Sequence, residues 1–253
     1  MLLAISAAST AYAESPFDWS TTELELQWGS FERPSFAGGG SEENVSITLQ
    51  HADGWKYGDN FCFMDYIESS KRDDNFNNGD WYGECYANLS LGKIFGKKVG
   101  FGPVKDVGVI MGVNFGDDPG VLKFQPGLRL SWDIPGFSFL NTDFMAYLDY
   151  NDGVRAGGAP MESDSWMLDV NGAYPFTIAG YDFSLEGHVE YLAPRRDEFG
   201  GKLPWWVFSQ IEFRWNASKH VSIGFEWQVA LNKLGDSETD DWKAIQALFV
   251  YRF

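Results

Sequence analysis

The sequence predicts an all-β protein, a twelve-stranded antiparallel transmembrane β-barrel. Three observations predict this fold. Apolar and polar residues alternate with a period of two in twelve segments of roughly ten residues, the length at which a tilted strand crosses a bilayer. Aromatic residues gather near the ends of these segments, and the gaps between segments alternate between long and short. An even number of strands lets a sheet close with every strand antiparallel to both neighbours.

The alternation by itself fits two kinds of β-protein. In residues 221–231, for example, Phe225 and Trp227 lie on one face and Glu226 and Gln228 on the other. A soluble sandwich would bury the apolar face, whereas a membrane barrel turns it outward to lipid and turns the polar face inward to a lumen. The expected strands cover residues 22–28, 45–51, 60–68, 81–91, 106–114, 122–132, 142–150, 166–174, 182–191, 205–215, 221–231 and 242–253.

The segment ends, the gaps and the C-terminus favour the membrane barrel. Aromatic residues at strand ends form the interfacial girdles of such barrels. From a periplasmic N-terminus, the odd-numbered gaps are long and polar like external loops, and most even-numbered gaps are short. The exception is the gap at residues 92–105, which we expect to hold extra structure. The last strand ends in Phe253, which resembles the terminal signal that barrel-insertion machinery recognises.

Residues 1–13 are expected to be a secretory signal peptide, and residues 14–253 the barrel domain. The first stretch is small and apolar and ends in Ala11-Tyr12-Ala13, a small-x-small cleavage pattern. It lacks the basic residues with which such signals begin, so we expect a truncated start or an initiator further upstream. Export of a membrane barrel predicts the outer membrane of a Gram-negative bacterium, with outer-membrane lipid around the wall.

The charge of the chain excludes one class of partner. Its 253 residues include 36 Asp and Glu against 19 Lys and Arg, a formal net charge of −17. Such a field repels phosphate backbones, so no nucleic-acid partner is expected. Aromatic residues make up 17% of the chain and charged residues only 22%, a composition that excludes an acidic disordered tail.

The two cysteines test the register of the third and fourth expected strands. If Tyr66 and Trp81 flank the connecting loop, Cys62 and Cys85 lie directly opposite each other in the antiparallel pair. Such a pair can be bridged, although the geometry is restricted. Two alternatives stay open: a disulfide, or two unpaired cysteines that face lipid.

The same register assigns the other side chains of this hairpin to the two faces. Phe61, Phe63 and Asp65 are expected to point inward, together with Tyr82 and Glu84 of the facing strand. Phenyl rings can stack on a flat heterocycle, and carboxylates can accept hydrogen bonds from sugar hydroxyls. The alternative is that the rings only fill space in a narrow barrel.

Carboxylates dominate the rest of the predicted lumen. Such a pore admits neutral or cationic solutes and discourages nucleotides, whose phosphates it repels. We expect four basic residues to pair with some of the acids, namely Lys123, Arg129, Arg214 and Arg252. The further side chains expected to face inward are Glu23, Glu25, Gln27, Asp143, Tyr147, Asp149, Asp169, Asn171, Glu186, His188, Glu190, Gln210, Glu212, Glu226, Gln228 and Gln246.

No enzymatic activity and no cofactor are expected. The chain has no Gly-x-Ser-x-Gly and no His-Glu-x-x-His motif. Glu186, His188 and Glu190 share one strand face and could form a hydrolase centre or a metal cluster. A lumen histidine that its neighbours hydrogen-bond is the commoner arrangement, and we count the three among the solute-binding residues. The acidic pairs at 73–74 and 117–118 could bind Ca²⁺ weakly or be solvated turn residues.

Two stretches of the chain resemble a known family. Residues 51–65 read His-Ala-Asp-Gly-Trp-Lys-Tyr-Gly-Asp-Asn-Phe-Cys-Phe-Met-Asp, and residues 83–92 read Gly-Glu-Cys-Tyr-Ala-Asn-Leu-Ser-Leu-Gly. They resemble the nucleoside-specific channel-forming outer-membrane proteins (Tsx-like). The resemblance implies a monomeric twelve-stranded barrel that takes up nucleosides or similar small neutral solutes. It also implies that base and ribose contact the matching lumen residues Phe61, Phe63, Asp65, Tyr82 and Glu84.

The sequence therefore predicts a substrate-selective diffusion channel of the outer membrane, with nucleosides as its solutes. Two other hypotheses remain. One is a structural or receptor barrel with a blocked lumen, whose external loops bind a phage or another partner. The other is an outer-membrane hydrolase centred on His188.

Overall fold

The computed structural model describes residues 16–33, 35, 38–70, 78–117, 120–235 and 241–253. The expected signal peptide at 1–13 lies outside these residues, as do the acidic pair at 73–74 and Asp118.

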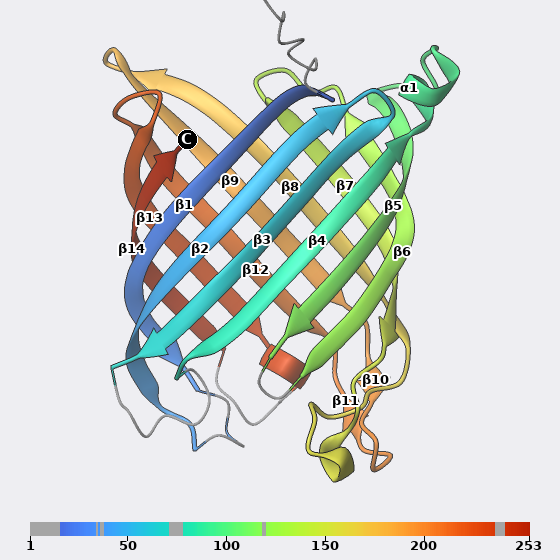
Figure 1. Cartoon of the computed structure of the whole chain (residues 1–253), viewed down its shortest axis with the longest axis vertical. Helices are drawn as coiled ribbons and strands as arrows, with labels where there is room; N and C mark the ends of the chain where they lie inside the picture. Colours follow the sequence, from blue (N-terminus) through green and yellow to red (C-terminus); the bar gives the residue numbers. More distant parts are fainter. Residues whose placement is uncertain (1–15, 34, 36–37, 71–77, 118–119, 236–240) are drawn as a thin grey trace, which may run out of the picture.

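Twelve long strands close into one antiparallel barrel, as predicted (Figure 1). Around the barrel their order is β1-β14-β13-β12-β9-β8-β7-β6-β5-β4-β3-β2. The strands are β1 (Phe17–Glu32), β2 (Ser41–Trp55), β3 (Gly58–Ser69), β4 (Asp80–Ser90), β5 (Val104–Gly116), β6 (Val121–Trp132), β7 (Phe139–Asp149), β8 (Ser165–Ile178), β9 (Tyr181–Leu192), β12 (Trp206–Asn216), β13 (Val221–Leu231) and β14 (Trp242–Arg252).

The first and last strands close the barrel. Leu24 of β1 pairs with Tyr251 of β14, and the N–H of Phe253 donates to the carbonyl of Thr22 at 3.0 Å. Every barrel strand therefore has two neighbours, which leaves no open edge for lipid to meet. None of the helices in the described ranges is long and apolar enough to cross a membrane.

Every predicted segment falls on a barrel strand, although some bounds differ. β1 and β2 are longer than predicted because their ladder continues outside the apolar band, as far as the pair of Glu32 with Ser41. β4 ends one residue earlier than predicted. The reason is that the Ser90 hydroxyl accepts a hydrogen bond of 3.0 Å from the N–H of Lys93 and begins a helix instead.

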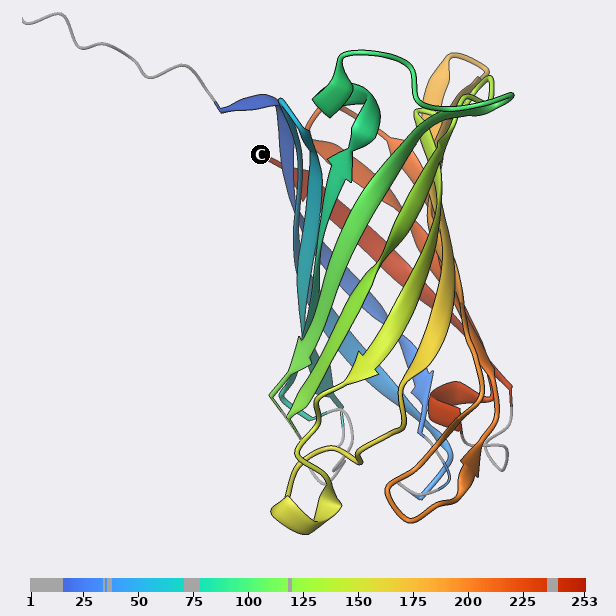
Figure 2. The ribbon, with the colours of Figure 1, turned by 90° about the vertical axis from the view of Figure 1, so that its right-hand side faces the viewer.

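The two ends of the barrel differ in their connections (Figures 1 and 2). We call the lower end in Figure 1 the loop end, because the long connections gather there. It holds the two-residue strands β10 (Arg195–Arg196) and β11 (Lys202–Leu203) and two short 3-10 helices, η2 (Val154–Ala156) and η3 (Lys233–Gly235). The opposite, terminus end holds the start of β1, the C-terminus, short turns and α1 (Leu91–Phe95). The gap expected to hold extra structure, residues 92–105, contains all of this helix except Leu91.

The outer wall is apolar and the inner face is largely polar. On β1, Leu26 and Trp28 are 48% and 56% exposed, whereas the alternating residues Glu25 and Gln27 are each at most 5% exposed. This arrangement is the reverse of a soluble protein, so the sandwich alternative is wrong. Two apolar clusters also lie inside the barrel, and both are in the half nearer the loop end. One contains Ile110, Met145, Tyr147, Met167 and Leu192, and the other Phe31, Ala230 and Ala244.

Candidate functional site in the barrel lumen

The β3–β4 hairpin has the predicted register. Cys62 pairs with Cys85, which places Phe63 opposite Glu84 and Asp65 opposite Tyr82. Because side chains directly opposite in an antiparallel pair share a face, these four and Phe61 line one wall of the lumen. The rings of Phe61 and Phe63 lie 6.1 Å apart, and those of Phe63 and Tyr82 lie 6.2 Å apart. They form an aromatic strip across two strands.

The carboxylates on this wall are hydrogen-bonded by neutral donors. The hydroxyls of Tyr82 and Tyr86 donate to Glu84 at 2.5 and 2.8 Å, and the Asn114 amide donates to it at 2.9 Å. The Thr48 hydroxyl donates to Asp65 at 2.6 Å. No basic side chain of the described chain forms an ion pair with either carboxylate. The wall therefore presents carboxyl groups beside aromatic rings.

The second predicted group lies on the facing wall. Glu186, His188 and Glu190 follow one another on the inner face of β9. Four strands separate β9 from β4 on the shorter way round the barrel, so the two inward-facing groups lie on different walls of the lumen. Within the described ranges, Glu190 makes no hydrogen bond and no ion pair with another side chain, and it is 7% exposed.

His188 has the surroundings of a structural lumen histidine. Its Nδ1 lies 2.8 Å from Asp169, and its Nε2 lies 3.1 Å from the Gln210 side-chain oxygen. Both ring nitrogens are thus occupied, and neither contacts a hydroxyl that could act as a nucleophile. In the part of the chain that the structure describes, no group of three His, Cys, Asp or Glu side chains could hold a metal ion.

The four lumen cations pair with acids, as predicted. Arg214 contacts Glu23 at 2.7 Å, Glu25 at 2.6 Å and also Glu212. The other pairs are Arg129 with Asp143 and Asp59, Lys123 with Asp149 and Glu162, and Arg252 with Glu23. Sequence reasoning missed three members of these ion pairs, namely Asp59, Glu162 and Arg195. Glu162 and Arg195 lie in the long connections of the loop end, where alternation does not predict which way a side chain points. Arg195 closes the loop end by donating to Glu162 at 2.7 and 2.9 Å.

The lumen is open to different degrees along its length. Toward the terminus end, Phe61 is 36% exposed, and the side chains of Asp59 and Glu186 are 36% and 30% exposed. Toward the loop end, Gln125 and Gln246 are completely buried beside the two apolar clusters. The side chains around the two apolar clusters are therefore fully buried, whereas several side chains toward the terminus end are partly exposed.

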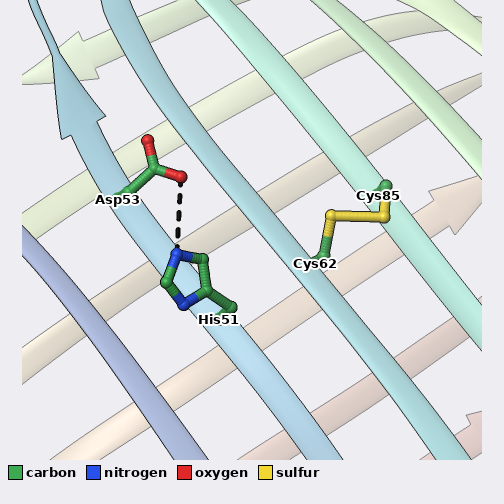
Figure 3. Close-up of a disulfide and its surroundings, with 4 residues drawn as sticks. All are labelled: His51, Asp53, Cys62 and Cys85. Atoms are coloured by element: carbon green, nitrogen blue, oxygen red, sulfur yellow. Dashed lines mark ion pairs between the residues drawn. A yellow bond between two sulfur atoms is a disulfide. The ribbon is translucent and has the colours of Figure 1, made fainter. Parts of the chain in front are cut away.

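The disulfide lies on the outside of the same hairpin (Figure 3). Cys62 and Cys85 are bonded, with their Cα atoms 4.1 Å apart. On the neighbouring strand β2, His51 Nε2 lies 3.6 Å from an Asp53 carboxylate oxygen, and His51 Nδ1 lies 2.7 Å from the Thr22 hydroxyl. These side chains face away from the lumen, so the disulfide does not contact a solute inside it.

Comparison with known proteins gives structural matches only. No protein-family model matches the chain, and no curated protein matches it by sequence. Among solved structures, a NanC porin aligns with a TM-score of 0.52 and 13% identity over 90% of this chain and 98% of that chain. A KdgM porin aligns with a TM-score of 0.50 and 9% identity over 90% of this chain and 99% of the porin.

A third match has a different activity. An active-site mutant of outer membrane phospholipase A from Escherichia coli aligns with a TM-score of 0.51 and 9% identity, over 95% of this chain and 94% of that chain. The chain has the fold of an outer-membrane β-barrel. At these identities the matches establish the fold alone, and the resemblance to nucleoside-specific channels stays a prediction.

Proposed function

We propose that the protein is a monomeric solute channel of the Gram-negative outer membrane, and that nucleosides or similar small neutral solutes pass through it. The observation that carries this proposal is the closed barrel with an apolar outer wall and an aromatic, acidic inner wall. Porins are among the proteins with this fold. In the proposed channel the loop end is external and the terminus end is periplasmic.

The two facing walls suit a nucleoside. The rings of Phe61 and Phe63 stack against the base. The carboxylates of Asp65 and Glu84 accept hydrogen bonds from the ribose hydroxyls, and the Tyr82 hydroxyl exchanges hydrogen bonds with them. Glu186, His188 and Glu190 complete the site from the opposite wall. Carboxylates repel the phosphate of a nucleotide, which favours the uncharged nucleoside. Weak contacts at several positions suit conduction better than one tight site.

Passage requires a rearrangement in the half of the lumen nearer the loops. Met145 and Leu192 are at most 1% exposed there, so a solute must displace the apolar clusters to pass. We also propose that the barrel-insertion machinery recognises Phe253 and that residues 1–13 direct export of the chain. Phe253 is 69% exposed and lies outside the β14 ladder, where another protein can reach it.

Current block in planar bilayers tests the channel. The refolded protein is inserted at single-channel density, and adenosine, thymidine, AMP and glucose are added in turn. We expect block by the two nucleosides and weak block by AMP and glucose. A steady current that none of the four solutes changes would sink the nucleoside assignment and leave a general pore.

A second candidate is a receptor barrel that conducts nothing and acts through its external loops. The filled half of the lumen favours it, because Gln125, Gln246, Ile110 and Leu192 are inaccessible to water. The fold of the reconstituted protein is first checked by its heat-modifiable migration in gel electrophoresis. Zero conductance of the folded protein would then support this candidate over the channel.

A further inference from the structure

The connection between β4 and β5 is unlike the tight turns of the terminus end. Residues 91–105 carry Lys93, Lys97, Lys98 and Lys105 and no Asp or Glu, in a chain whose net charge is −17. The β2–β3 and β8–β9 connections at this end are the short residue pairs 56–57 and 179–180. This connection projects beyond the strand ends at the upper right of Figure 1, where α1 is labelled.

The segment is held firmly in place. The Lys93 ammonium donates to the carbonyls of Trp55 and Gly58 at 2.7 and 3.0 Å, which ties α1 to the β2–β3 turn. Asp106 accepts a hydrogen bond of 2.8 Å from the N–H of Gly92 and another from the Ser90 hydroxyl. Gly96 ends the helix with a φ of 61°, a conformation that favours glycine.

The rest of the segment points basic and apolar groups outward together. Lys97, Lys98 and Lys105 are exposed, and none of them forms an ion pair with another described residue. Beside them, Phe95 and Phe101 are 61% and 69% exposed. Ammonium groups mixed with exposed phenyl rings are typical of segments that lie at a membrane surface.

The segment lies at the edge of the apolar outer wall. Leu89 on β4 and Val109 on β5 belong to the lipid-facing outer wall and are 42% and 44% exposed. The segment follows directly beyond them, at the end of this wall (Figure 1). Lys105 lies at the bulge with which β5 begins, next to this wall, and its side chain is exposed.

We propose that residues 91–105 form a basic clamp that binds the headgroups of anionic phospholipids in the adjacent, periplasmic leaflet. The phosphodiester accepts hydrogen bonds from Lys97, Lys98 and Lys105, and Phe95 and Phe101 insert beneath the headgroup. Charge complementarity selects this occupant, because the segment is basic while most of the chain is acidic. The inference rests on the membrane barrel and not on conduction, so a failure of either proposal leaves the other standing.

Spin-labelled lipids test the clamp in reconstituted bilayers. The association of labelled phosphatidylglycerol with the barrel is compared with that of labelled phosphatidylcholine. We expect a preference for phosphatidylglycerol of at least about fivefold at low salt. It should disappear in about 1 M NaCl, where the Debye length is about 3 Å. The triple variant Lys97→Gln, Lys98→Gln, Lys105→Gln should lose the preference, and a control with Gln in place of Lys202, Lys233 and Lys243 at the loop end should keep it.

An unchanged preference in the triple variant would overturn the proposal. Equal association of the two lipids with the wild-type protein would also overturn it and would point to an acidic periplasmic protein as the partner.

A second measurement tests whether the phenyl rings of the segment enter the bilayer. Both native cysteines are bonded, so Phe101→Cys introduces the single reactive thiol for a spin label. We expect the label to be reached by oxygen more readily than by a soluble nickel chelate, whereas the reverse order would overturn the proposed insertion.

Discussion

Arg129 on β6 and Asp143 on β7 are directly opposite in register and form a two-bond fork inside the barrel. The guanidinium donates from Nε and from a terminal nitrogen to the two carboxylate oxygens, each at 2.7 Å. The Asp143 side chain is only 3% exposed. A bidentate fork of this kind fixes both side chains, and a third bond of 2.9 Å to Asp59 ties them to β3. The polar interior thus braces the barrel as well as lining it.

Removing the cation of this fork should destabilise the protein. Arg129→Gln leaves Asp143 buried and charged without its partner, so we expect the free energy of unfolding to fall by about 3–5 kcal/mol. Tryptophan fluorescence during urea unfolding in lipid vesicles measures the change. Arg196→Gln is the matched control, because Arg196 is exposed on the short strand β10 and its side chain bonds only the Gly200 carbonyl, at 3.3 Å. Equal stability of the two variants would contradict the bracing role.

The apolar cluster that contains Met145 should limit the current. Met145 is 1% exposed inside the barrel, and Met145→Ala removes three side-chain heavy atoms from the filled part of the lumen. We expect a larger single-channel conductance than in the wild-type channel. Met111→Ala is the control, because Met111 is 52% exposed on the outer wall. If the Met145 variant conducts like the control, the constriction lies elsewhere.

The aromatic strip should determine the strength of nucleoside block. Stacking on an aromatic side chain contributes about 1–3 kcal/mol per base, so Phe63→Leu should raise the adenosine concentration for half-block by about fivefold or more. Phe61→Leu should act in the same direction. Phe144→Leu, on the outer wall where Phe144 is 55% exposed, controls for general effects on the barrel. Block that is unchanged in both lumen variants would rule out stacking on these rings.

The disulfide should stabilise the barrel without affecting conduction. It joins residues 23 positions apart, for which chain entropy predicts a stabilisation of about 3 kcal/mol. The double variant Cys62→Ser, Cys85→Ser should therefore unfold at a lower urea concentration. Its conductance should match that of the wild type, because the disulfide faces away from the lumen. A changed conductance would show that the hairpin shifts when the bond is absent.

Much of this architecture could be predicted from local sequence. The period of two places every second side chain on one face, so the alternation of Phe225 and Glu226 fixes both the strand and its two faces. Placing Tyr66 and Trp81 at the two ends of the connecting loop predicts that Cys62 pairs with Cys85, as the structure shows. The register matters because a slip of one residue would move every side chain of a strand to the opposite face. The helix in residues 92–105 was expected only as an irregularity, since a helix of five residues has too few turns to show a period.

The partners inside the lumen were decided by closure of the barrel. Arg214 meets Glu23 although they are 191 positions apart, and the β3–β4 wall lies across the interior from β9, which carries His188 and Glu190. The sequence determined the strands, their faces and the sign of the lumen charge, because these depend on neighbours along the chain. Only the tertiary structure decided which acids receive a cation and where Met145 and Leu192 fill the interior. Those depend on strand stagger and on contacts across the barrel, which no local pattern specifies.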